Sequence, residues 1–184
     1  MSFTLLGILN SQAAGGGGSA YEHIASFTGT GSSITVSNIP QTYKHLVIHA
    51  RVGTTGSTEM NITFNGSSDS VYTYLDNGHY ESSEFYNHAS AVAYGQIPVG
   101  NTGQDGSNHV SAYVLNIPDY ARTNSYPSMS GYYARPMNSS GNEKRVGSFA
   151  MSYRRFEALS SITFVPFDNN FTNKTRFSIY GVTG

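Results

Sequence analysis

The sequence predicts an all-β protein: an antiparallel β-sandwich or jelly roll of about ten short strands, preceded by an extended N-terminal arm. Three observations predict this fold. Apolar residues recur at every second position in several short runs, turn-forming residues separate these runs, and no stretch has the periodicity of a helix. The 184 residues suffice for one domain with its own core. We therefore expect an arm with a glycine-rich tether over residues 1–20 and one sandwich domain over residues 21–184.

The expected strands follow one another after the arm. In KHLVIHARV and EMNITFN, apolar and polar residues alternate, as in a strand with one face on the core and one on solvent. The residues expected to face the core in these two strands are Leu46, Ile48, Ala50, Val52, Met60, Ile62 and Phe64. The full set of expected strands is 21–28, 34–36, 44–52, 59–65, 70–75, 89–97, 109–117, 128–134, 144–156, 159–165 and 175–183.

Residues that favour turns lie between these strands. The expected turns are 29–31, 65–66, 76–78, 100–106, 138–141 and 168–173, each rich in glycine, asparagine or aspartate. A helical turn over residues 40–44 or 81–88 is the one departure from β-structure that the sequence suggests.

The charge distribution argues against nucleic acid as a partner. The formal net charge is -1, and only 11% of the residues are charged. Two basic pairs, Lys144-Arg145 and Arg154-Arg155, are expected on a solvated strand face, because a phosphate-binding surface needs many clustered positive charges. The chain has no cysteine, which excludes disulfides and thiolate metal sites.

No set of residues has the spacing of a catalytic or metal-binding site. His45 and His49 are four residues apart, but on a strand this places them about 13 Å apart, too far to chelate one ion. Residues 168–173 lack the glycine and the distal glutamate of a calcium-binding EF-hand loop. Glu81 and Glu84 are expected to be solvated. We therefore expect no catalytic residue, no metal and no cofactor, and no enzymatic activity.

A group of aromatic residues is a candidate for contact with another molecule. Tyrosine and phenylalanine rings give a large contact area at a low entropic cost, which suits a binding surface. Packing in the core is the more ordinary role of such rings, and a subunit interface or a glycan contact is the alternative. The candidate residues are Tyr72, Tyr74, Tyr80, Phe85, Tyr86 and Tyr94.

The first twenty residues have the composition of an assembly arm. Five large apolar residues precede the four consecutive glycines of residues 15–18. The apolar run lacks the basic flank of a signal peptide and is far shorter than a membrane span, so we expect no contact with a membrane. The residues expected to bind a partner are Phe3, Leu5, Leu6, Ile8 and Leu9.

Several segments resemble a known family. The segments are LLGILNSQAAGG, ITVSNIP, KHLVIHARV, ITFNGSSDSVYTY and SSITFVPFDNNFTNKTRFSIYGVTG. Together they resemble the small β-sandwich virion proteins of tailed bacteriophages, of the type seen in cyanophages and marine phages. The resemblance implies a hairpin at Asn65-Gly66, after the strand that ends in phenylalanine and before Tyr72. It also implies a place in the virion, either as a capsid decoration (cement) protein or as the head domain of a tail protein.

These two locations imply different partners. A decoration protein would bind the major capsid protein on the capsid exterior through its arm, and would stabilise the shell. A tail fibre, spike or baseplate head domain would instead dock on a tail adaptor through the arm and bind host surface glycans through the tyrosine-rich segments 72–94 and 120–133. The short chain, with no repetitive shaft, favours the capsid.

The energy of the arm predicts that the protein acts as an oligomer. Burying five large apolar side chains contributes roughly 7–15 kcal/mol. Ordering the seven residues from Phe3 to Leu9 costs about 7–14 kcal/mol of backbone entropy. For one arm, the free energy gained by burial is therefore about equal to the entropic cost of ordering. Several arms on one oligomer bind more tightly, because the first bound arm raises the effective concentration of the others. We expect a homo-oligomer, a trimer or a dimer.

Overall fold

The structure of the chain is a computed structural model, which describes residues 20–56, 59–80, 82–101, 110–135 and 144–183. The arm, and the expected turn at 138–141, lie outside the described residues. The described residues form thirteen strands and no helix, so the predicted all-β fold is confirmed. The strands are β1 (Tyr21–Thr28), β2 (Ile34–Val36), β3 (His45–Thr54), β4 (Glu59–Phe64), β5 (Tyr72–Tyr80), β6 (Ser83–Val92), β7 (Gly95–Pro98), β8 (Gly100–Asn101), β9 (Ser111–Pro118), β10 (Ser128–Arg135), β11 (Arg145–Tyr153), β12 (Ile162–Pro166) and β13 (Arg176–Val182).

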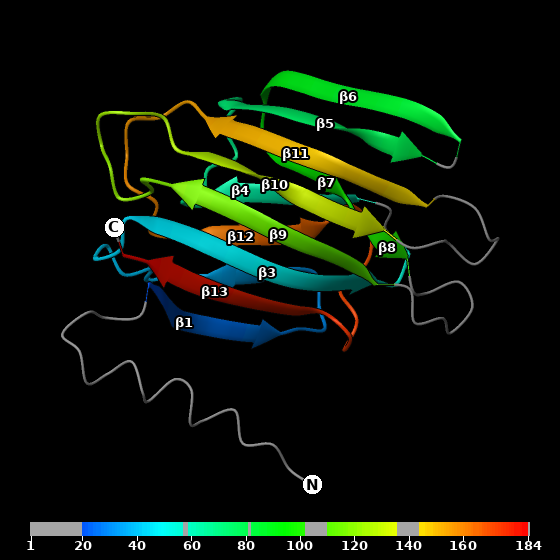
Figure 1. Cartoon of the computed structure of the whole chain (residues 1–184), viewed down its shortest axis with the longest axis horizontal. Coiled ribbons are helices and arrows are strands. Elements are labelled where there is room, and N and C mark those ends of the chain that lie inside the picture. The colour runs from blue at the N-terminus through cyan, green and yellow to red at the C-terminus, as the bar shows by residue number, and fades with distance from the viewer. Residues whose placement is uncertain (1–19, 57–58, 81, 102–109, 136–143, 184) are drawn as a thin grey trace, which may run out of the picture.

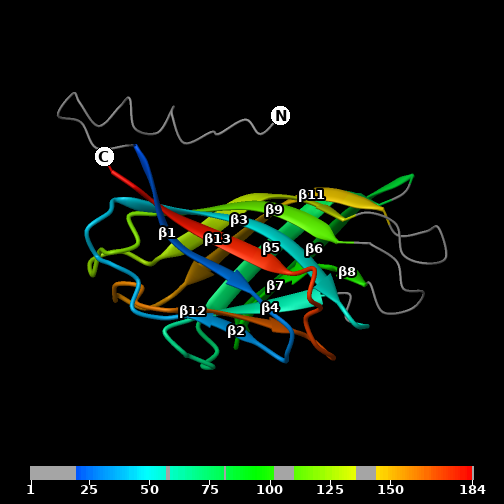
Figure 2. The same ribbon diagram turned by 90° about the horizontal axis from the view of Figure 1, so that it is seen from below.

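The strands form two layers (Figures 1 and 2). The large sheet has the order β1-β13-β3-β9-β10-β11-β5-β6, and the short β8 pairs in parallel with the end of β3. The small sheet has the order β2-β12-β4-β7. All pairs within these two orders are antiparallel. The predicted antiparallel sandwich is therefore confirmed. No helix in the described residues is long and apolar enough to cross a membrane.

The core lies between the two sheets. The seven residues expected to face it from 46 to 64 are all buried, which confirms the inward faces predicted from KHLVIHARV and EMNITFN, although Val47, on the opposite face of its strand, is buried as well. Aromatic rings fill the space between the layers. Phe164 of the small sheet stacks on Phe177 of the large sheet, with ring centroids 4.3 Å apart, and Tyr153 meets Phe64 edge-on at 5.8 Å. Such ring pairs add to the stability that burial provides.

The turn predicted at residues 76–78 is wrong, because β5 runs straight through it to Tyr80. The three residues are held by their neighbours in the large sheet. Asp76 is buried and accepts a hydrogen bond from the Tyr133 hydroxyl at 2.5 Å. Gly78 lies so close to β11 that a Cβ atom there would come within 2.2 Å of the Val146 carbonyl oxygen. Tertiary contacts therefore override the local preference of Asp-Asn-Gly for a turn.

The Asn65-Gly66 segment is a tight turn, but the hairpin expected from the family resemblance is wrong. Both residues have positive φ angles, 51° and 67°. The chain then crosses between layers, because β4 belongs to the small sheet and β5 to the large one. Tyr72 links the two strands by its side chain instead, since its hydroxyl accepts from the Phe64 amide at 2.8 Å and donates to the Ser67 carbonyl at 3.1 Å.

Residues 81–97 also differ from the prediction. The expected strand at 89–97 is two strands, because β6 ends at Val92 in the large sheet and β7 begins at Gly95 in the small one. The helical turn suggested for 81–88 is wrong from residue 83 onward, where β6 begins. The expected turn at 168–173 does connect β12 to β13, and its Phe171 is buried in the core.

Candidate binding face

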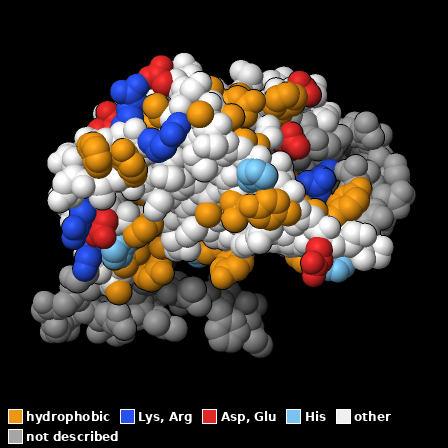
Figure 3. Space-filling model, turned by 90° about the horizontal axis from the view of Figure 1, so that it is seen from above, with side chains coloured by type: hydrophobic (Ala, Val, Ile, Leu, Met, Phe, Trp, Pro, Cys, Tyr) orange, Lys and Arg blue, Asp and Glu red, His pale blue; other side chains and the backbone are white. Residues whose placement is uncertain are grey.

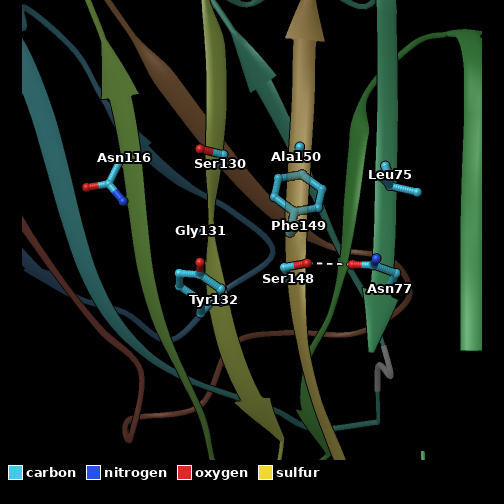
Figure 4. Close-up of a pocket in the computed structure, with 9 residues that line it drawn as sticks. All are labelled: Leu75, Asn77, Asn116, Ser130, Gly131, Tyr132, Ser148, Phe149 and Ala150. Atoms are coloured by element: carbon cyan, nitrogen blue, oxygen red, sulfur yellow. Dashed lines mark hydrogen bonds between the residues drawn. The ribbon is translucent and has the colours of Figure 1, made fainter. Parts of the chain in front are cut away.

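The outer surface of the large sheet carries the candidate site. Strands β9, β10, β11 and β5 lie side by side there, and every second residue points away from the core. On β10, for example, Ser130 and Tyr132 are exposed while Met129, Gly131 and Tyr133 are buried. We call the resulting surface the Tyr132 face. Its residues, drawn in Figure 4, are Leu75, Asn77, Asn116, Ser130, Tyr132, Ser148 and Ala150, over Gly131 and Phe149.

Strand register sets the order of side chains on the Tyr132 face. Tyr132 pairs with Ser148 of β11, and Ser148 pairs with Asn77 of β5. The Ser148 hydroxyl donates a hydrogen bond of 2.5 Å to Asn77 Oδ1 (Figure 4). Two residues along β10 from Tyr132, Ser130 pairs with Asn116 of β9. Together these residues border a shallow hollow of about 390 Å³.

The side chains of the Tyr132 face are polar or apolar and uncharged. Its lining contains amide and hydroxyl groups and one exposed aromatic ring, and no acidic or basic side chain. Tyr132 is 73% exposed, so its ring as well as its hydroxyl is open to solvent. Amides and hydroxyls donate and accept hydrogen bonds without charge, and a flat ring offers an apolar face. The arrangement therefore suits a neutral polar ligand.

A buried polar pair lies on the other side of the same strands. Asp76 of β5 and Tyr133 of β10 point into the sandwich, where the Tyr133 hydroxyl donates to the Asp76 carboxylate. Burial raises the pKa of Asp76 from 3.8 to about 6, although the Tyr133 hydrogen bond and the charge of Arg145 oppose the shift. Burial, together with Asp76, raises the pKa of Tyr133 well above its ordinary value, so its hydroxyl keeps its proton. The pair is closed off from solvent and offers no group to a ligand.

The six aromatic residues predicted as a contact surface do not lie on one surface. Tyr72 and Tyr74 point into the sandwich and are buried, at 0% and 7% exposure. Tyr80, Phe85 and Tyr94 are half-buried. The rings of Tyr80 and Phe85 hold the Arg145 guanidinium between them, with centroid distances of 4.9 and 5.2 Å. Tyr86 is 66% exposed and lies on β6. The exposed tyrosine of the hollow, Tyr132, is not one of these six, but it lies in the tyrosine-rich segment 120–133 that the tail hypothesis expects to contact glycans.

The remaining sequence predictions have separate outcomes. Phe3, Leu5, Leu6, Ile8 and Leu9 of the arm, and Glu81, lie outside the described residues. His45 and His49 both lie on β3, and each contacts a different group. His45 Nδ1 accepts a hydrogen bond from the Asp119 amide at 3.1 Å, and the centroid of the His49 ring lies 5.4 Å from that of the Tyr180 ring. Within the described ranges, no three histidine or acidic side chains are grouped as metal ligands would be.

Comparison with known proteins gives a likeness of fold alone. No protein-family model and no curated protein matches the chain. Among solved structures, Caenorhabditis elegans galectin LEC-6 is 12% identical, with 86% of this chain and 96% of that chain covered and a TM-score of 0.33. A toad ovary galectin, solved with thio-digalactose, is 10% identical over 71% and 98%, with a TM-score of 0.27. CG-16, a homodimeric agglutinin from chicken liver, is 13% identical over 72% and 98%, with a TM-score of 0.25. These similarities are too low to say what this chain binds.

Proposed function

We propose that this chain is a bacteriophage virion structural protein, and that it acts as a capsid decoration protein, without enzymatic activity. One observation carries the proposal. The arm sequence places five large apolar residues before four consecutive glycines, and large apolar side chains are stabilised by burial.

The partner that fits such an arm is the major capsid protein on the outside of the shell. A shell offers many equivalent sites, so an oligomer can engage several arms at once, and this offsets the entropy of ordering each arm. Apolar side chains on both faces of an extended segment suit burial within another protein, either along a sheet edge or in a groove. The near-neutral chain favours neither nucleic acid nor an anionic membrane surface as a partner.

Removal of residues 1–14 is the direct test. We expect the truncated protein to lose binding to capsids that lack the decoration protein, while its circular dichroism and thermal unfolding stay those of the full chain. A finer test replaces one apolar arm residue by a charge. Leu6→Asp should weaken binding at least tenfold, because it puts a charge where an apolar group is buried. Ser11→Asp, close by in the same arm, is the control that adds the same charge at a polar position. Normal occupancy of particles by the truncated protein would refute the proposal.

A second function is favoured by the Tyr132 face. The head domain of a tail fibre, spike or baseplate would need an exposed surface for host glycans, and an exposed ring among amides and hydroxyls provides the chemistry that neutral sugars require. Copy number separates the two locations. Hundreds of copies per particle would indicate decoration, and a small multiple of three or six would indicate the tail.

Substitution of Tyr132 tests the glycan function. We expect Tyr132→Ala to weaken binding to host envelope polysaccharide about tenfold, because loss of ring contact removes about 1.4 kcal/mol. Tyr126→Ala is a matched control, since Tyr126 is 48% exposed but stacks on Phe156, outside the Tyr132 face. Glycan-array binding or affinity electrophoresis measures both variants. Equal binding by the two variants, or no binding by the unaltered protein, would exclude this surface as a glycan site.

A further inference from the structure

The described strands leave one long sheet edge unprotected. An edge strand presents unpaired backbone groups, and proteins commonly limit such edges by making them short, bulged or charged. The small sheet ends in β2 and β7, which have three and four residues. The large sheet ends on one side in β1, whose pairing with β13 is broken by a bulge between His23 and Ala25. Its other end is β6, which has ten residues and pairs with β5 alone among the described strands.

The composition of β6 offers little protection against pairing. Its sequence, SEFYNHASAV, contains Glu84 as its one acidic residue and no lysine, arginine or proline. Seven of its ten residues are exposed, and Phe85, Ala89 and Val92 are half-buried against the core, so its outer face and its edge are open. Figure 3 views the molecule from the side on which β6 lies and shows charged side chains toward the two ends, with histidine, hydrophobic and other uncharged side chains between them.

We propose that β6 pairs with β6 of a second copy of this chain, antiparallel and about a twofold axis near Tyr86. The axis stands perpendicular to the sheet, so the two large sheets join into one. This pairing makes an isologous interface, in which the same strand serves both protomers. Ala91 has a left-handed backbone conformation, with a φ of 57°, and the register between β5 and β6 shifts there. The regular part of the strand therefore ends before Ala91. The pairing therefore uses residues 83–89.

The side chains of β6 complement themselves in this register. Glu84, Tyr86 and His88 share the outer face, because they pair with His79, Asn77 and Leu75 of β5. A twofold axis at Tyr86 sets the two Tyr86 rings against each other. It also sets Glu84 opposite the partner's His88, so a ring N–H of His88 can donate a hydrogen bond to the Glu84 carboxylate. Aromatic pairs and opposite charges across strands both stabilise a sheet, whereas like charges weaken it.

The pairing also orients the Tyr132 faces. Because the axis is perpendicular to the joined sheet, both Tyr132 faces lie on the same side of the dimer. The two β1 strands lie at the far ends, so two arms enter the dimer from opposite edges. The inference stands apart from the proposed function, since the dimer can be measured without capsids or glycans.

Cysteine cross-linking tests the register. The chain has no cysteine, so one introduced thiol gives an unambiguous result. We expect Tyr86→Cys to form a disulfide-linked dimer rapidly under mild oxidation, because the two side chains meet at the axis. Tyr132→Cys is the matched control, a tyrosine of similar exposure on the interior strand β10. Cross-linking of Tyr86→Cys no faster than that of Tyr132→Cys would overturn the proposed register.

A charge exchange tests the interface independently. His88→Glu alone should weaken dimerisation about 2- to 30-fold in sedimentation equilibrium, because it places two carboxylates opposite each other twice. Glu84→Lys alone should also weaken it, because it removes the carboxylate that faces the partner's His88. The double variant Glu84→Lys with His88→Glu restores opposite charges and should restore the dimer. Circular dichroism checks that each variant is folded. A monomeric unaltered protein, or a double variant as weak as the single ones, would overturn the proposal.

Discussion

We expect Asn65→Ala to lower the free energy of unfolding by about 3–5 kcal/mol, a large part of the total stability of a domain of this size. The Asn65 side chain ties the turn after β4 to the segment before β12. Its Nδ2 donates to the Ala158 carbonyl at 2.9 Å and to Glu157 Oε1 at 3.1 Å. Its Oδ1 accepts from the Ser160 and Ser161 amides at 2.9 and 3.2 Å. Alanine removes these bonds, and the one from the Ser160 hydroxyl to Oδ1 at 3.2 Å, at a position with a φ of 51°, which alanine also tolerates less well than asparagine.

Asn38→Ala separates the two causes. Asn38 has a φ of 56° but is exposed, and no side-chain hydrogen bond is seen for it among the described residues. Its replacement should cost only the backbone strain, about 1 kcal/mol. Urea denaturation of both variants gives the comparison. Similar losses in the two variants would mean that the bonds to residues 157–161 contribute nothing to stability.

We expect Asp76→Asn to remove a pH dependence from the stability of the sandwich. Burial raises the pKa of Asp76 in the folded state to about 6, against 3.8 for an ordinary aspartate. Between these two values the unfolded chain releases the proton and the folded chain keeps it, so the free energy of unfolding falls as pH rises from about 4 to 6. The loss reaches about 3 kcal/mol at most above pH 6. Asparagine cannot ionise, so this loss should be absent from the variant. From pH 4 to pH 7 the free energy of unfolding of the variant should rise by about 2–3 kcal/mol relative to that of the original protein.

The measurement is the difference between variant and original protein in denaturant unfolding across this pH range. The difference is needed because Glu157 acts in the opposite direction. The Tyr153 hydrogen bond holds the pKa of Glu157 below its usual value, so its contribution is lost as pH falls. Tyr133→Phe serves as a second check. It removes the hydroxyl that donates to Asp76, so the pKa of Asp76 should rise and the upper end of the pH range over which stability falls should move above 6. An unchanged pH slope in Asp76→Asn would show that Asp76 does not cause it.

Local pattern was sufficient to predict the class of fold but not the connections between layers. Alternation in 44–52 and 59–65 depends on neighbouring residues alone, and the structure confirms it. The errors at 65–66, 76–78 and 89–97 have a different origin. There the chain either changes sheet or is held straight by a distant strand, as Gly78 is by β11 and Asp76 by Tyr133. Such contacts join residues more than fifty positions apart, and no local preference contains them.

The Tyr132 face shows the same limit. Its residues occupy alternate positions in LNIP, SMSGYYAR and GSFAMSY, so each strand revealed which side chains would point outward. The order of the strands was not readable from one sequence, and this order brings Asn77 next to Ser148 and Tyr132. The sequence indicated the tyrosine-rich segments 72–94 and 120–133, and two of the tyrosines in the first segment fill the core. Exposure of a ring depends on the register between strands, which composition does not encode.

The pairing of β1 with β13 decides how the sandwich responds to mechanical force. Tension applied at Tyr21, the first residue of β1, acts on the pair that Tyr21 makes with Val182. A pull along the strand loads all seven register pairs of β1 at once, in shear, whereas a pull away from the sheet opens them one after another from Tyr21. Shear is the resistant geometry, because many hydrogen bonds must break together. The bulge between His23 and Ala25 divides the seven pairs into three and four, and it is the point at which a loaded strand would yield first.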